Sequence, residues 1–135
     1  MKKPHYLSFN KIGSPDLGYI SVAENFDNIP FAVQRVYWTY YTPQDVTRGG
    51  HAHLILEQVI VAVSGTIIFT TEDLEGNISE FILDRPEKAL FIPKHIWRDI
   101  KFSHSAVLLC LASEKYTEDD YIRDYEIFQK LKDGN

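Results

Sequence analysis

Several features are scarce in this 135-residue chain, and each absence narrows the possible functions. Cys110 is the single cysteine, so no internal disulfide can form, and we expect a cytoplasmic protein. No apolar run approaches the roughly 20 residues that cross a bilayer, and the opening MKKPHYLSFNK lacks the apolar stretch of a secretory signal. The formal net charge is -5 without any long basic run, which argues against nucleic acid as a partner.

The chain does contain a succession of short runs typical of strands. From about residue 5 to about 113, runs rich in β-branched and aromatic residues alternate with turn signals, and Ser64-Gly65 divides one long run into two strands. Strands of this length and spacing predict a small sandwich or barrel. The unbroken apolar run SAVLLCLAS predicts a strand buried on both faces.

The C-terminal part has a different pattern. In YTEDDYIRDYEIFQKLK, apolar and aromatic residues recur at helical spacing, with acids early and lysines late as the helix dipole prefers. Thr117 is the candidate N-cap, so we predict one helix over about 117–132, attached to the barrel by Tyr121 and Tyr125. The whole is predicted to be a single all-β domain over residues 1–135 with a short C-terminal helix.

The most informative stretch is TRGGHAHLILEQVIVAVSG, residues 47–65. A His-x-His pair on a strand places both imidazoles on one face. His51 and His53, followed by Gln58 and Gly65, keep the spacing of the first metal-binding motif of the cupin barrels. The second cupin motif, Pro-x-Gly-x-x-His, corresponds here to PKHIWR, with Arg98 in place of the last ligand.

These two replacements argue against a metal. A divalent cation is typically held by histidines together with carboxylates. Gln58 removes the anionic ligand, and Arg98 directs a permanent cation without a lone pair toward the ion. We therefore expect no metal and no other cofactor; a metal would need His95 or His104 as a replacement ligand.

A polar cluster inside an apolar barrel is costly unless it binds something. An unperturbed imidazole titrates near pH 6.5 and can take and return a proton at cellular pH. Arginines suit a phosphate or a developing oxyanion. The pattern therefore favours enolisation next to a carbonyl, and the alternative is a structural histidine pair bonded to carbonyls or acids.

Four blocks in order resemble the sugar 3,4-ketoisomerases that act on dTDP-4-keto-6-deoxyglucose: FAVQRVYWTY, TRGGHAHLILEQVIVAVSG, FIPKHIWRDI and LASEKYTEDDYIRDYEIFQ. The likeness runs from about residue 29 to 128. It implies a cupin jelly-roll barrel, metal-free catalysis and a keto group moved from C4 to C3, for 3-amino-3,6-dideoxysugar biosynthesis. It also implies a homodimer with exchanged N-terminal strands.

The resemblance further implies residue roles. His51 would move the proton between C3 and C4, and the implied catalytic residues are His51, His53 and Tyr37. The implied substrate-binding residues are Arg48, Arg98, Gln58 and Arg35. Leu17 and Arg98 stand where gluco-product and galacto-product members differ; Arg98 favours gluco, whereas Leu17 fits neither type. The alternatives are a metal-dependent cupin enzyme, a cupin-type epimerase, and a non-catalytic module that binds nucleotide sugars.

Overall fold

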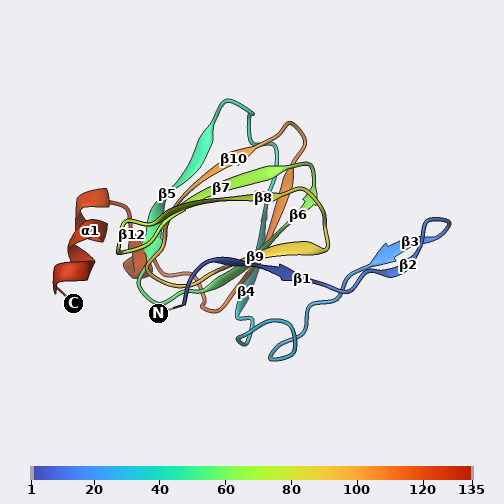
Figure 1. Ribbon diagram of the computed structural model, residues 1–135, viewed down its shortest axis with the longest axis horizontal. Coiled ribbons are helices and arrows are strands. Elements are labelled where there is room, and N and C mark those ends of the chain that lie inside the picture. The colour runs from blue at the N-terminus through green and yellow to red at the C-terminus, as the bar shows by residue number, and fades with distance from the viewer. Residues whose placement is uncertain (1, 135) are drawn as a thin grey trace.

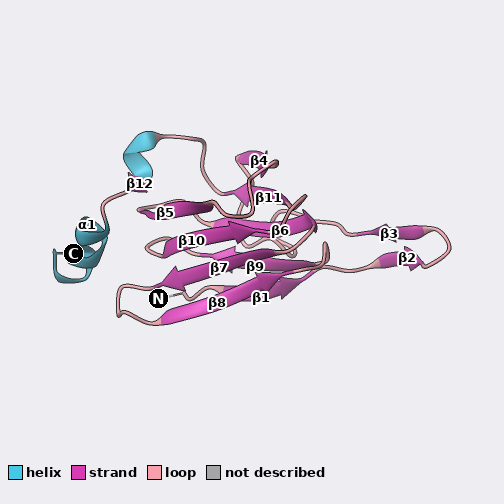
Figure 2. Cartoon of the chain, turned by 90° about the horizontal axis from the view of Figure 1, so that it is seen from above, coloured by secondary structure: helices cyan, strands magenta, loops and turns pink. Residues whose placement is uncertain are grey.

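The computed structural model describes residues 2–134 as two packed five-stranded sheets with a helix at one end (Figures 1 and 2). The first sheet has the order β1 (His5–Ser8), β9 (Lys88–Ile92), β6 (Gln58–Ser64), β11 (Val107–Ala112), β4 (Arg35–Thr39). The second has the order β12 (Tyr121–Ile122), β5 (Thr47–His53), β10 (Trp97–Phe102), β7 (Ile67–Glu72), β8 (Ile78–Leu83). Neighbouring strands pair antiparallel, which confirms the predicted jelly-roll class.

The core lies between the two sheets because side chains alternate along each strand. On β6, Ile60 and Ala62 join the inner cluster, whereas Val59 and Val61 face outward under Ile29 and other residues that precede β4. On β11, Leu108, Cys110 and Ala112 are fully buried, and the intervening leucines are half-buried. The prediction that this strand is buried on both faces is therefore right for its inner face only.

The C-terminal helix begins later than predicted. Helix α1 spans Tyr125–Gly134, and Asp124 precedes it: its Oδ1 accepts hydrogen bonds from the backbone N–H groups of Glu126 (2.9 Å) and Ile127 (3.4 Å). Thr117 makes no side-chain capping bond and precedes a 3₁₀ turn, η1 (Glu118–Asp120). The predicted start at residue 117 is therefore wrong.

The reason for the later start is strand pairing at the edge of the second sheet. Tyr121 and Ile122 form β12 and pair with His53 and Ala52 of β5, so the chain stays extended there. The outer face of β5 is then covered, because Ala52 is buried with Ile122 and with Phe128 of α1. This cover leaves the alternate residues of β5 directed into the barrel.

A hairpin of β2 (Ile12–Ser14) and β3 (Gly18–Ile20) projects from the barrel (Figures 1 and 2). Within residues 2–134 these two strands pair only with each other. β1, by contrast, is built into the first sheet beside β9 of the same chain. In the same described range, no helix is long and apolar enough to cross a membrane.

Candidate active site

A pocket of about 280 Å³ opens between β4, β5, β6 and β10. Six of the seven predicted site residues line it: Arg35, Tyr37, Arg48, His51, Gln58 and Arg98. Arg48 is exposed, Tyr37 and His51 are half-buried, and Gln58 and Arg98 are buried. The pocket thus leads from an exposed cationic rim to a buried cationic floor.

A β-bulge sets the position of His51 beside Arg98. The two residues pair directly across β5 and β10, but Asp99 pairs with Gly49, so Gly50 is the extra residue. Gly49 has φ 90°, and a Cβ there would lie 2.7 Å from the carbonyl oxygen of Arg98. The bulge therefore requires glycine at position 49.

His51 is a neutral base at physiological pH. Burial, and after it the positive charge of Arg98, lowers the pKa of His51 to about 4 from its usual 6.5. Its ring centroid lies 4.9 Å from that of His53 and 5.1 Å from that of Tyr121. An unprotonated imidazole next to a cation can accept a proton from a carbon acid, and the cation stabilises the anion that results.

His53 lies in the layer behind the pocket wall. Its Nδ1 is 3.1 Å from Oδ2 of Asp120, whose carboxylate also accepts the backbone N–H groups of Ile55 (2.7 Å) and Leu56 (3.2 Å). Burial, then the charge of Arg98, lowers the pKa of His53, so the ring is neutral and its proton is on Nδ1. Nε2 is left buried, with no hydrogen-bond partner in the described part of the chain.

The floor of the pocket is a hydrogen-bonded chain of three side chains. Arg98 donates from Nε and Nη2 to the carbonyl oxygen of Ile96 (3.2 and 3.1 Å) and from Nη1 to Oε1 of Gln58. Gln58 donates from Nε2 to the Tyr37 hydroxyl (2.9 Å) and to Sγ of Cys110 (3.3 Å). Burial raises the pKa of Tyr37, which keeps its phenol protonated.

Arg98 supplies an unneutralised positive charge at the floor. Burial lowers its pKa to about 10, so the guanidinium remains protonated at pH 7. Its side chain is 1 % exposed, and among residues 2–134 no carboxylate forms an ion pair with it. Three of the five N–H groups of the guanidinium donate hydrogen bonds to Ile96 and Gln58, which leaves two for a ligand oxygen.

Sequence reasoning missed Tyr121 and Arg123, which also line the pocket. Tyr121 was expected to attach the helix; instead its ring lies 4.5 Å from that of His53, beneath the Arg123 guanidinium at 4.2 Å. Tyr121 and Arg123 are two residues apart, so interpreting this segment as a strand would have placed both side chains on the same face of the sheet. Tyr125 does connect the helix to the barrel, through a 2.7 Å hydrogen bond to Glu72.

The donor set does not fit a metal ion. Oε1 of Gln58 is occupied by the Arg98 guanidinium, which has no lone pair and repels a cation. His95 and His104, the replacement ligands that a metal would require, line other hollows of the surface. The arrangement suits an anion.

Comparison with known proteins gives a consistent result. Residues 2–133 match the family described as WxcM-like, C-terminal (FdtA). A TDP-4-oxo-6-deoxy-alpha-D-glucose-3,4-oxoisomerase of Aneurinibacillus thermoaerophilus is 39 % identical over 126 residues, which cover 92 % of this chain and 88 % of that protein. A 3,4-ketoisomerase structure from Helicobacter canadensis has 39 % identity and a TM-score of 0.89, and the match covers 95 % of this chain and 96 % of that chain. A histidine-to-asparagine variant of the Thermoanaerobacterium thermosaccharolyticum 3,4-ketoisomerase QdtA, in complex with TDP-4-keto-6-deoxyglucose, has 30 % identity, a TM-score of 0.91 and coverage of 97 % and 94 %.

Proposed function

Because this chain belongs to the WxcM-like, C-terminal (FdtA) family, whose relatives described above are sugar 3,4-ketoisomerases, we propose that it isomerises a TDP-4-keto-6-deoxyhexose to the 3-keto sugar. The observation that carries this proposal is the neutral His51 paired across the sheet with the buried charge of Arg98. The product is a precursor for amination at C3. The single cysteine, buried and free, supports action in the cytoplasm.

The reaction relocates two protons around an enediolate, one from C3 to C4 by way of His51 and one from the C3 oxygen to the C4 oxygen. His51 removes the proton from C3, and the C–H electrons form the C3–C4 double bond while negative charge develops on the C4 oxygen. Arg98 stabilises that charge through its two free N–H groups. The hydroxyl proton of C3 passes to the C4 oxygen with Tyr37 assisting, and His51 returns its proton to C4, so no electron acceptor is needed.

The remaining site residues bind and position. Arg48, exposed at the rim, and the half-buried Arg35 would bind the diphosphate of the nucleotide. His53 packs against His51 from behind the pocket wall. The resemblance of Arg98 to the residue of gluco-product members favours the gluco configuration at C4 of the product. Leu17, at the tip of the β2–β3 hairpin, does not line the pocket of its own chain.

The test is incubation with TDP-4-keto-6-deoxyglucose, followed by trapping with a 3-aminotransferase and assignment of C4 by NMR. His51→Asn should lower turnover at least about 100-fold, the low end of general acid–base catalysis, while TDP binding persists. His104→Asn, outside the pocket, is the matched control. Tight TDP binding by the wild type without isomerisation would indicate a binding module, and stoichiometric metal on elemental analysis would indicate a metal-dependent enzyme.

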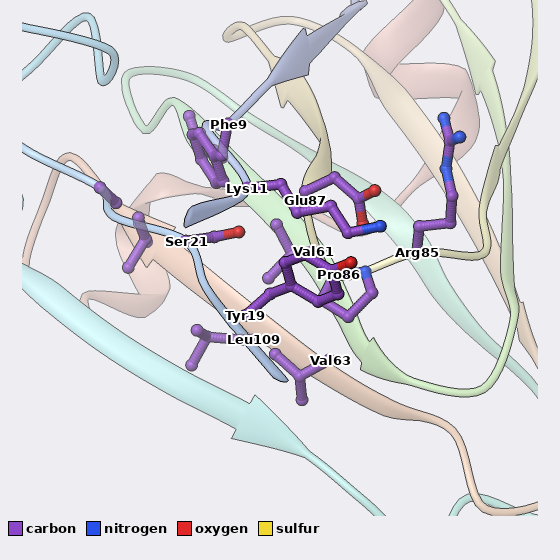
Figure 3. A pocket seen from close by; sticks show the side chains of 13 residues that line it. Phe9, Lys11, Tyr19, Ser21, Val61, Val63, Arg85, Pro86, Glu87 and Leu109 are labelled. Atoms are coloured by element: carbon purple, nitrogen blue, oxygen red, sulfur yellow. The ribbon is translucent and has the colours of Figure 1, made fainter. Parts of the chain in front are cut away.

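We also propose a homodimer in which the hairpin β2–β3 packs on a second copy. Leu17 and Ile20 on the hairpin are 91 % and 65 % exposed, and such apolar surface calls for a partner. A mostly apolar hollow of about 560 Å³ lies where the N-terminal segment crosses the outer face of the first sheet (Figure 3). Because β1 pairs within its own chain, the exchanged segment would be the hairpin alone.

Light scattering during gel filtration tests the dimer. The wild type should run at about twice the chain mass of 15.6 kDa, and a Leu17→Ser, Ile20→Ser variant should shift toward the single-chain mass. A wild type that runs at 15.6 kDa at micromolar concentration would refute it.

A further inference from the structure

The orientation of the Gln58 amide follows from the hydrogen-bonding capacity of its neighbours. Gln58 is the first residue of β6, 2 % exposed, and lies between Arg98 and Tyr37. A guanidinium only donates hydrogen bonds, so the amide oxygen must face Arg98. The NH₂ group then faces the Tyr37 hydroxyl and Sγ of Cys110, and both of its hydrogens are used. Gln58 therefore has no donor left for a substrate.

This orientation determines what the Tyr37 hydroxyl can do. Its oxygen already accepts a hydrogen bond from Gln58, so its own hydrogen must point elsewhere. Two directions remain: the neighbouring thiol of Cys110 and the pocket. Sulfur is a weak acceptor, so an oxygen atom of a bound sugar outcompetes it. Tyr37 thus meets the substrate as a donor.

We propose that Gln58 is a positioning residue, which holds the hydroxyl hydrogen of Tyr37 toward the substrate oxygen that becomes negative during isomerisation. This inference rests on the proposed function. The charge of Arg98 polarises the amide and strengthens its donation to Tyr37, so the three groups act as one chain.

The proposal explains why a neutral amide, and not a carboxylate, stands at this position of the barrel. A carboxylate would accept the hydroxyl hydrogen of Tyr37 and turn it away from the substrate. It would also neutralise Arg98, the buried cation at the floor of the pocket. Both changes remove groups that stabilise negative charge in the transition state.

Two substitutions of similar volume separate positioning from packing. Gln58→Glu keeps the shape of the side chain but reverses its hydrogen bonding, and should lower kcat about 100-fold or more with KM little changed. Gln58→Met removes the fixed donor to Tyr37 together with the amide oxygen that accepts from Arg98, without adding a charge, and should lower kcat about 10-fold. Gln129→Glu, the same chemical change on the exposed side of α1, is the control. A role in packing alone predicts the opposite order, with Met more damaging than Glu.

A double-mutant cycle with Tyr37→Phe completes the test. If Gln58 acts through Tyr37, then most of the roughly 10-fold cost of Gln58→Met should disappear once the hydroxyl is gone. Multiplicative losses in an active, folded enzyme would overturn the inference while the proposed function stands. Circular dichroism and TDP titration verify folding for each variant. A wild type without ketoisomerase activity would overturn the proposed function, and this inference with it.

Discussion

The pH dependence of turnover tests the state of His51 directly. Its pKa is lowered from the usual 6.5 to about 4, which corresponds to a preference of about 3 kcal/mol for the neutral ring. The ratio kcat/KM reports the ionisation of the free enzyme, the state that the structure represents. At pH 5 about 90 % of His51 should still be the free base, whereas a histidine with the usual pKa would retain about 3 %.

We therefore expect kcat/KM to stay level from pH 8 to about 5 and to halve near pH 4. The assay is initial-rate conversion of TDP-4-keto-6-deoxyglucose at sub-KM concentration, with product trapped after neutralisation. A kcat/KM that halves between pH 6 and 7 in folded protein would refute the conclusion that burial and Arg98 hold His51 neutral.

The same shifts act on stability and require a control. The pKa values of His51, His53 and His95 are all lowered in the folded state, so the unfolded chain binds more protons below its histidine pKa of about 6.5. The stability that these groups contribute is complete above about pH 6.5 and is lost progressively as the pH falls from there toward the lowered folded-state values. Circular dichroism at each pH, and full recovery of activity on return to pH 7.5, separate titration of His51 from acid unfolding.

Two further substitutions test the supports of the site. Asp120→Asn places an NH₂ group against a backbone N–H or against the His53 ring. It should therefore lower the free energy of unfolding in urea by about 2–4 kcal/mol and reduce kcat. The control Asp119→Asn, on the exposed side of the same turn, should leave both quantities unchanged. Gly49→Ala puts a Cβ 2.7 Å from a backbone oxygen, whereas position 76 has a similar φ of 84° but no neighbour within 4 Å. The melting temperature of Gly49→Ala should therefore be several degrees lower than that of Gly76→Ala. Equal melting temperatures would show that the bulge tolerates a side chain.

Local sequence patterns predicted the parts of the structure that depend on local rules. The two-residue period of a strand placed His51 and His53 on one face, and Ala52 between them indeed packs outward under Phe128. The cupin spacing brought Gln58 and Arg98 to the same pocket although 40 positions separate them. These outcomes follow from the alternation of side chains along a strand and from the spacing of the two cupin motifs.

The failures concern contacts that no local pattern encodes. Tyr121, Tyr125 and Phe128 have helical spacing, but Tyr121 belongs to a strand because β5 offers it an edge. The pairing of His53 with Asp120 joins residues 67 positions apart and becomes predictable only once that strand is recognised. Periodicity alone cannot choose between two elements that accept the same residues.

The charges of the pocket show how one barrel frame can serve opposite chemistries. A cupin metal site presents anionic and neutral donors to a cation, and here the corresponding wall presents Arg98 and a neutral amide. Asp120 still fixes the tautomer of His53, as carboxylates do for metal-bound histidines. The unpartnered Nε2 of His53, however, lies within the electric field of Arg98. With that guanidinium buried and free of any described ion pair, the pocket carries an uncompensated positive charge, which a bound anion or a developing enediolate would neutralise. The reversal of charge, more than the histidine pair itself, therefore distinguishes a site for keto-group migration from a site for a metal.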